Sequence, residues 1–533
     1  MPVPGRRPVR RTADVNSRQG TLLAVILGSG IVFLDSTVVN VALPKIGEEL
    51  PRGIFGVLEG QSYVYNGYLL TLSALLIAAG ALADAHGRRR LFIVGLSGFG
   101  VTSVLCGLAP SLEALVAFRI LQGAAGAILV PGSLAILTAG FEGEGLGRAF
   151  GLWAGASGAT TILGPFVGGL LVQTLSWRAA FLLNAPLVLI ALWATLRHVE
   201  ESRNPEADGS IDWAGAAVAA LAVGGLSFGA IYGQQHQWRD VLGPAALAVG
   251  LVATVSFVVL MARGRHPLVP LGMFRSRNFA VTNLSTFLIY GALYVLLYEQ
   301  AIFAQGTLGY TAAAAGLVSV VSSLLLTVLS TRAGVLGSRY GPRRFMVAGP
   351  TLMAAGVLWY ARIPATSTPW FLLPGDPASW IPPVSFLVDF LPGGVVFGAG
   401  LAIMVAPLTT ALMTSVPPRN AALASAINNA VSRVGPQLVN AVIFVAITAV
   451  FYGGLAARLP GLDTTSQALR DAIAPLNRPA ASVAPAIAGA ARDASTDAYH
   501  LAMLMAAALL ALGALVNAVG IRDPTRAPRD EQA

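Results

Sequence analysis

Long apolar runs alternate with polar connections along almost the whole chain. A membrane-spanning helix needs about 20 mostly apolar residues, and fourteen runs come close to that length or exceed it. They cover residues 20–43, 60–83, 91–109, 112–138, 148–173, 178–196, 212–232, 241–262, 279–304, 313–335, 345–362, 384–412, 420–452 and 498–520. Two connections are long, 363–383 and 453–497, and the second reads as a flexible outer cap. The pattern predicts an all-α polytopic membrane protein with fourteen transmembrane helices.

The composition agrees with a membrane protein and excludes both a protein of several soluble domains and an intrinsically disordered chain. Of the 533 residues, 55% are hydrophobic and 11% are charged, and the mean hydropathy is +0.70. Soluble domains carry about 25% charged residues, so these charges cannot coat several soluble domains. Intrinsic disorder requires low hydrophobicity. Lipid must therefore be the solvent for most of the chain.

The distribution of arginines indicates which helix ends face the cytoplasm. The net charge is +9, but the basic residues are scattered rather than gathered on one face, which argues against a nucleic-acid partner. Alternate connections hold most of them, among them Arg88, Arg89, Arg90, Arg343, Arg344 and Arg419. Cytoplasmic loops are enriched in Lys and Arg, so we expect both termini to be cytoplasmic. The single cysteine, Cys106, has no partner for an intramolecular disulfide.

An internal repeat divides the chain into two halves. Residues 80–90 align with residues 334–344, and each stretch follows the second helix of a six-helix set. Repeated halves around a central site are the usual build of secondary transporters. We expect a cytoplasmic tail (1–19), a six-helix bundle (20–196), two additional helices with linkers (197–278), a second six-helix bundle that includes the outer loop (279–520), and a second cytoplasmic tail (521–533).

Two charged residues lie deep inside predicted helices. Asp35 is in the first helix, and Arg119 is in the fourth, with Gln122 three residues later on the same face. Charged groups within a span are rare and costly, and they mark ion pathways or paired partners. Burial favours the uncharged form of a carboxyl group, so Asp35 is a candidate proton-binding group. Arginine stays protonated, so Arg119 would act by changing the proton affinity of a nearby carboxylate. A purely structural pairing of Asp35 is the alternative.

Glycines mark two further motifs. The connection at 80–90 contains Gly80, Asp84, Gly87 and Arg88, where glycine permits close helix approach and a tight turn. The fifth helix contains Gly164, Pro165, Gly168 and Gly169. Glycines four residues apart let a neighbouring helix pack closely, and the proline removes a backbone hydrogen bond. The alternatives are a topology signal for the arginines and ordinary packing for the small residues.

These motifs together resemble the major facilitator superfamily, specifically its fourteen-helix drug:proton antiporter branch. The stretch from Leu34 to Pro44, which holds Asp35 and Asn40, is similar to that branch's helix 1 signature, and the fifth-helix motif resembles its antiporter motif. The resemblance implies a major facilitator fold of two six-helix bundles plus two linking helices. It also implies that Asp84 interacts with a neighbouring helix N-terminus as a conformational latch, and that Arg119 is linked to proton movement.

Polar residues in the second half supply the remaining candidates. Glu299 is a second acid near the outer end of the ninth helix, where it could bind a proton or an organic cation. Tyr294 belongs to a tyrosine stripe that is more often a packing face or interfacial belt than a ligand site. Asp389 is interfacial or faces a cavity. The substrate-cavity candidates are Asn40, Gln122, Tyr294, Asp389, Asn428, Asn429 and Arg433; the last three resemble family positions that face the cavity.

The sequence lacks nucleotide-binding and metal-binding motifs, which reduces the number of functions to consider. The sequence has no nucleotide-binding Gly-x4-Gly-Lys-Ser/Thr loop and no metal-ligand spacing, so we expect no cofactor and no enzyme activity, with the proton gradient as energy source. We expect a monomeric, proton-coupled exporter of amphipathic, cationic drugs in a bacterial inner (plasma) membrane. An exporter of a lipid, siderophore or endogenous antibiotic is the alternative. A membrane-embedded transferase would require a polar catalytic cluster that the sequence does not show.

Overall fold

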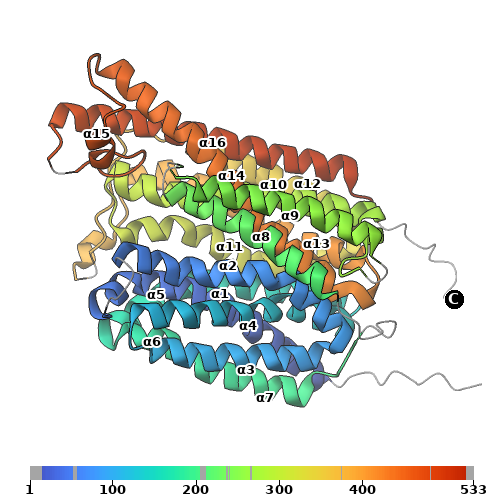
Figure 1. Cartoon of the computed structure of the whole chain (residues 1–533). Coiled ribbons are helices and arrows are strands. Elements are labelled where there is room, and N and C mark those ends of the chain that lie inside the picture. Colours follow the sequence, from blue (N-terminus) through green and yellow to red (C-terminus); the bar gives the residue numbers. More distant parts are fainter. Residues whose placement is uncertain are drawn as a thin grey trace, which may run out of the picture.

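The computed structural model describes residues 15–51, 57–203, 212–235, 238, 240–264, 267–373, 375–480 and 482–523, and these form helices joined by short connections (Figure 1). The first half contains α1 (Val15–Glu49), α2 (Val57–His86), α3 (Arg88–Gly107), α4 (Leu112–Gly140), α5 (Gly143–Thr174), α6 (Trp177–Leu182) and α7 (Asn184–His198). Two further helices follow, α8 (Trp213–Gln235) and α9 (Leu242–Arg263). The second half contains α10 (Arg277–Ile302), α11 (Ala312–Tyr340), α12 (Pro342–Tyr360), α13 (Leu391–Thr414), α14 (Ala421–Arg458), α15 (Gln467–Ala472) and α16 (Pro485–Gly520).

Twelve helical segments of the described residues are long and apolar enough to cross a membrane, with α6 and α7 together forming one of them, Trp177–His198. The 32-residue α5 and the 19-residue α12 are not among the twelve, but both pack within the bundle, α5 on α1 and α11, and α12 on α13 and α16. The all-α polytopic fold class predicted from the sequence is therefore confirmed, and the count of fourteen spans stays a prediction.

The helices form two groups, and the inserted pair lies beside the seam between them. Figure 1 shows α1–α7 in the lower group and α10–α16 in the upper group. The inserted helices α8 and α9 pack tightly on each other, and α8 also contacts α2 and α14, one helix from each group. The Cβ of a side chain at Gly225 would lie 2.8 Å from the Cα of Gly250, so glycine is required for this close contact.

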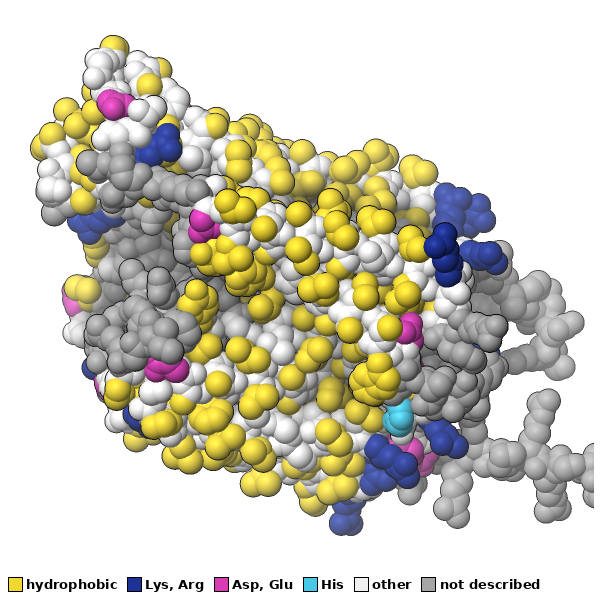
Figure 2. Space-filling model, viewed as in Figure 1, with side chains coloured by type: hydrophobic (Ala, Val, Ile, Leu, Met, Phe, Trp, Pro, Cys, Tyr) yellow, Lys and Arg dark blue, Asp and Glu magenta, His cyan; other side chains and the backbone are white. Residues whose placement is uncertain are grey.

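The surface has the distribution of polarity expected in a bilayer. Hydrophobic side chains cover the middle of the face seen in Figure 2, and a dense group of Lys and Arg side chains lies at the right-hand end, where α16 finishes. Several valines and leucines of α9 are largely exposed, for example Val252 at 66%. We call the end that carries Arg88, Arg89, Arg90, Arg343, Arg344 and Arg419 the arginine-rich end, and the opposite one the outer end.

The long connection predicted at 453–497 is mostly helical in the structure, so its prediction as a flexible cap is wrong. Helix α14 continues to Arg458 and α16 begins at Pro485, with α15 between them. At about 1.5 Å per residue, α14 (38 residues) and α16 (36 residues) each exceed the hydrocarbon thickness of about 30 Å. Their outer ends project together (Figure 1), and an ion pair between Arg458 Nη2 and Asp497 Oδ2 (2.6 Å) joins them. Hydropathy missed these turns because helix outside the hydrocarbon can carry polar residues.

Candidate functional site

Asp35 and Arg119 form an ion pair in the interior of the first half. The Oδ2 of Asp35 lies 2.5 Å from Nη1 of Arg119, and both side chains are fully buried. Asp35 is near the middle of α1, and Arg119 is in the second turn of α4 from its outer end. Two charges removed from water are tolerated only when they are paired and their remaining atoms are hydrogen-bonded. The structure brings together the two charged residues that the sequence singled out.

Polar partners surround this pair on all sides. The amides of Gln122 and Asn184 both donate to Oδ1 of Asp35, at 3.1 and 3.0 Å. Arg119 donates from Nη1 to Oε1 of Gln122 (2.7 Å) and from Nε to the carbonyl of Val64 (3.1 Å). Its guanidinium also lies over the ring of Tyr68, 4.1 Å from the centroid. Both carboxylate oxygens of Asp35 therefore accept hydrogen bonds, Oδ1 from two amides and Oδ2 from Arg119.

One atom of the cluster remains without a partner. Nη2 of Arg119 is buried and makes no hydrogen bond with any described residue. An unsatisfied buried donor on a charged group costs free energy, so this arrangement leaves the guanidinium of Arg119 only partly hydrogen-bonded.

Sequence reasoning missed part of the cluster. Asn184 begins α7 and is held by a hydrogen bond from its amide to Ser103 Oγ (3.0 Å), while Cys106 Sγ lies 3.5 Å from Oε1 of Gln122. Asn184 follows a run of apolar residues, and the only signal for it was a polar side chain within the predicted sixth span. It contacts Asp35 because α7 packs on α1 and α3.

Asp84 joins the first half to the second half at the arginine-rich end. Its Oδ2 accepts a hydrogen bond from the backbone N–H of Leu423 (2.9 Å) and its Oδ1 accepts one from that of Ala422 (3.3 Å), in the first turn of α14. Arg88 donates to Oδ1 of Asp84 (2.8 Å) and to the carbonyl of Pro418 (2.5 Å). A carboxylate at a helix N-terminus is stabilised by the free N–H groups and the helix dipole. This is the contact that the resemblance implies; its role as a latch stays a prediction.

The two halves meet at this end along two helix pairs, α2 with α14 and α5 with α11, which we call the two seams. Glycines allow close contact at both. A Cβ at Gly80 of α2 would lie 2.8 Å from the carbonyl oxygen of Ala422 in α14. On the other seam, Thr327 and Ser330 of α11 donate to the carbonyls of Gly155 and Gly151 in α5, at 3.2 and 2.9 Å. The two halves therefore touch through backbone at the arginine-rich end, so the structure is closed there.

The internal repeat appears in the structure as two equivalent turns, one before α3 and one before α12, which we call the two corners. Gly87 (φ 112°) precedes α3 and Gly341 (φ 90°) precedes α12, and both conformations favour glycine. The carboxylate of Glu201 accepts from the N–H groups of Arg89 and Arg90, at 3.1 and 3.2 Å, and that of Asp523 accepts from the N–H of Arg343 (3.0 Å). Each carboxylate lies just beyond the last helix of its half. The sequence repeat identified the corners but not these two acids.

The fifth-helix motif packs against the helix that carries Asp35. A Cβ at Gly168 would lie 3.1 Å from the Cα of Val38, and one at Gly164 would overlap Thr37. The glycine face therefore brings α5 against α1 directly after Asp35, which is the close packing that the spacing predicts. The surroundings of Asn40, Pro165 and Gly169 lie outside the described part of the structure.

Glu299 lies apart from Asp35, inside the second half. Its side chain is buried, and its Oε1 has no hydrogen-bond partner among the described residues. Nε2 of the neighbouring Gln300 and the hydroxyl of Tyr499 on α16 are also buried and unpaired. No salt bridge to Glu299 is found in the described residues. An isolated buried carboxylate is very unfavourable, so Glu299 differs from Asp35, which has a cationic partner.

The remaining candidates are spread over the second half. Asn428 donates to Asn283 Oδ1 (3.2 Å) and Thr286 Oγ1 (2.9 Å) and so ties α14 to α10, whereas Asn429 bonds within its own helix to Ser425. Tyr294 is 48% exposed. Asp389 lies at the outer end, where it accepts from Ser367 Oγ (2.7 Å). Arg433 is half-buried in the middle of α14.

Replacing Asp84 with Asn is expected to destabilise the protein markedly. The change leaves Arg88, which is 3% exposed, without its carboxylate, and breaking a buried pair costs about 3–5 kcal/mol. Thermal unfolding of the detergent-purified protein, followed by tryptophan fluorescence, measures the loss. The matched control is Arg90→Gln, which removes an exposed ion pair with Glu201 and should cost less than about 1 kcal/mol. Equal midpoints for the two variants would contradict the expectation.

Comparison with known proteins places this geometry in a family. Residues 25–439 match the model of the Major Facilitator Superfamily. The chain is 33% identical over 423 residues to the "Tetracenomycin C resistance and export protein" of Streptomyces glaucescens, and 34% identical over 424 residues to the "Multidrug resistance protein Stp" of Mycobacterium tuberculosis; each match covers 79% of this chain and 74% of the relative.

The fold has a close match among solved structures as well. The human organic anion transporter MFSD10 superposes with a TM-score of 0.59 at 13% identity, over 94% of this chain and 99% of that one. Together, the two repeated halves, the buried charged pair of the first half and these matches show that the chain belongs to the Major Facilitator Superfamily of membrane transporters and stands beside its drug-resistance exporters.

Proposed function

We propose that this protein is a proton-coupled exporter that exchanges protons for amphipathic, cationic compounds by alternating access. It works as a monomer in the bacterial plasma membrane, with the arginine-rich end in the cytoplasm and no cofactor. The observation that carries the proposal is the fully buried pair of Asp35 and Arg119. The names of the two relatives describe resistance and export and support the direction of transport.

The pair supplies a way to couple a proton to a conformational change. In this state Asp35 is ionised, since it accepts a hydrogen bond from Arg119 on one oxygen and two amide hydrogen bonds on the other. A proton on Asp35 removes the counter-charge, while Arg119 keeps its own charge at any physiological pH. An uncompensated buried charge is strongly destabilising. Protonation therefore favours a second arrangement in which Arg119 finds new partners.

The seams at the arginine-rich end are the elements that must move. Export requires the site to open toward the cytoplasm, load its compound and then close that end, as the two halves rock around the site. In the closed state α14 is held by Asp84, and α5 is held by Thr327 and Ser330. The glycines in the fifth helix connect this motion to α1, because they contact the residues next to Asp35.

Glu299 is the second proton-binding group in this proposal. It is protonated in the same state in which Asp35 is ionised, because it lacks a cationic partner among the described residues. Its release of a proton would leave a carboxylate able to attract a cationic compound. Exchange of one proton for a monovalent cationic compound moves no net charge, so the membrane potential does not drive it. A second proton per cycle that crosses 100 mV would add about 2.3 kcal/mol of driving force.

Export of an endogenous antibiotic is the alternative that a specific observation favours. One of the relatives is named for both resistance to and export of tetracenomycin C, in a Streptomyces species. The same proton-binding residues would serve such a cargo, and a neutral compound would not require ionised Glu299. Lipids and siderophores remain alternatives on the same fold.

A compound panel in inverted membrane vesicles tests the proposal. An acid-inside gradient is established, and each compound is expected to release protons saturably when the protein carries it. Ethidium represents the cationic drugs, and tetracenomycin C is the compound in the name of one relative. Glu299→Gln should lower the number of protons released per molecule of a cationic compound. Uptake of these compounds that proceeds equally well without any pH gradient would overturn proton coupling.

A further inference from the structure

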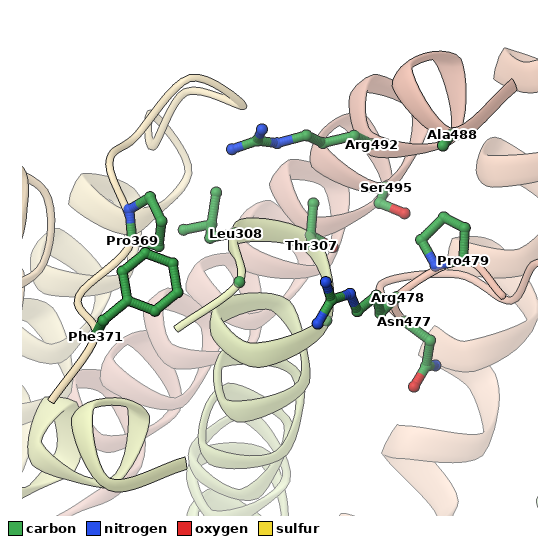
Figure 3. Close-up of a pocket in the computed structure, with 12 residues that line it drawn as sticks. Thr307, Leu308, Pro369, Phe371, Asn477, Arg478, Pro479, Ala488, Arg492 and Ser495 are labelled. Carbon is green, nitrogen blue, oxygen red and sulfur yellow. The ribbon is translucent and has the colours of Figure 1, made fainter. Parts of the chain in front are cut away.

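A cavity lined by both apolar and polar side chains lies at the outer end of the second half, and Asp35 is not among its lining residues. It has a volume of 230 Å³, and its wall combines the turn after α10 (Gly306, Thr307, Leu308 and Gly309), the loop at 369–371, residues 477–479 and the first turns of α16 (Figure 3). Compound-sized sites in proteins measure about 300–1,000 Å³. The cavity is therefore large enough for an ionic group and too small for an entire drug.

Two arginines face this cavity from different segments. Figure 3 shows Arg478 and Arg492 extending toward the turn that carries Thr307 and Leu308. The Nε of Arg492 is buried without a hydrogen-bond partner, and neither guanidinium forms an ion pair within the described residues. No acidic residue is among those that line the cavity. Two unpaired guanidinium groups at one cavity repel each other unless an anion lies between them.

The backbone at this site is strained in a way that positions Arg478. Leu476 has φ 63°, in the left-handed region that a branched apolar residue rarely adopts. Its carbonyl accepts from Thr307 Oγ1 (3.0 Å) and its N–H donates to Ser495 Oγ (3.1 Å). Both of these hydroxyl residues line the cavity. Strain of this kind persists where surrounding contacts hold it, and it concentrates at functional sites.

We propose that this cavity binds the phosphate or carboxylate group of an amphipathic molecule at the outer membrane surface. Arginine recognises both groups through paired N–H donors. Ser495, whose hydroxyl accepts from Leu476, and Asn477, whose amide carries two hydrogens, add further donors. The apolar rim formed by Leu308, Pro369 and Phe371, the last 58% exposed, suits the hydrocarbon part of the molecule. The proposal does not depend on proton coupling at Asp35.

Binding is tested on the full-length protein in a non-ionic detergent. The probes are inorganic phosphate, dioctanoyl phosphatidylglycerol and dioctanoyl phosphatidylcholine, at constant ionic strength, and the readout is the thermal unfolding midpoint. We expect a saturable rise with an anionic probe. Loss of one charged hydrogen-bonding partner should weaken binding at least about tenfold in Arg492→Gln and in Arg478→Gln. Arg478→Lys should retain more affinity than Arg478→Gln.

The matched control is Arg470→Gln. Arg470 is an outer arginine that already donates to the Thr464 carbonyl and lies over the ring of Tyr452, so its loss should leave binding unchanged. A response to inorganic phosphate as well as to phosphatidylglycerol identifies a site for free anions, and a response to phosphatidylglycerol alone identifies a lipid headgroup site. No response to either anionic probe, or undiminished binding in Arg478→Gln, would overturn the proposal. Arg478 is exposed, so that variant tests it even if Arg492→Gln fails to fold.

Discussion

Asp35→Asn is expected to abolish proton-driven export. The amide cannot exchange a proton at physiological pH, and it presents no negative charge to Arg119, whose Nη1 lies 2.5 Å from Asp35 Oδ2 in the wild type. The variant should therefore show no proton release when compound is added to inverted vesicles. Compound accumulation in cells expressing the variant should equal that in cells without the protein.

A second variant separates coupling from folding. Asp35→Asn alone leaves Arg119 buried and uncompensated, which costs about 3–5 kcal/mol, so loss of transport could reflect misfolding. The double variant Asp35→Asn with Arg119→Gln leaves no uncompensated buried charge, so its thermal midpoint should be higher than that of Asp35→Asn alone. It should still fail to couple, since no proton-binding carboxylate is present. Full proton-driven efflux in either variant would show that Asp35 is not the coupling group.

The fold could be predicted from the sequence because the bilayer leaves few alternatives. Runs of about 20 apolar residues can only form spanning helices or be buried, and the repeat at 80–90 and 334–344 fixed the division into halves. The same argument singled out Asp35 and Arg119 as residues that need partners, since each is too costly to bury alone, but it did not pair them with each other. The structure adds the distance between them and the helices that supply the remaining partners.

What the sequence could not supply were contacts between residues far apart in the chain. Asn184 is an ordinary amide in an apolar run, and only the packing of α7 on α1 and α3 shows that it donates to Asp35. Glu201 and Asp523 look like loop acids, and only the two corners show that each accepts hydrogen bonds from a helix N-terminus. The sequence did not predict the outer turns of α14 and α16, because polar residues in a helix outside the bilayer have no hydropathy signal.

Gly151→Val is expected to prevent closure of the arginine-rich end. A Cβ at this position would lie 2.5 Å from the Cα of Thr331 and 2.8 Å from the carbonyl of Ser330, and neither backbone atom can move aside without shifting α11. Overpacking of this kind costs about 1–3 kcal/mol, which shifts a two-state equilibrium at least about fivefold. The halves should therefore remain open to the cytoplasm, and export should fall because the compound cannot be enclosed and released outside.

The change in conformation can be measured at the opposite seam. Leu423→Cys, in the first turn of α14 beside Asp84, is buried when the arginine-rich end is closed. In a background without Cys106, a water-soluble maleimide should label it slowly in the otherwise wild-type protein and several-fold faster when Gly151→Val is added. Gly145→Val is the matched control, because it lies on the same helix and its Cβ would meet nothing within 4 Å. Because Leu423 lies on the α2–α14 seam and Gly151 on the α5–α11 seam, faster labelling would show that both seams open as one unit. Unchanged labelling, with export intact, would mean that α5 and α11 need not approach this closely during transport.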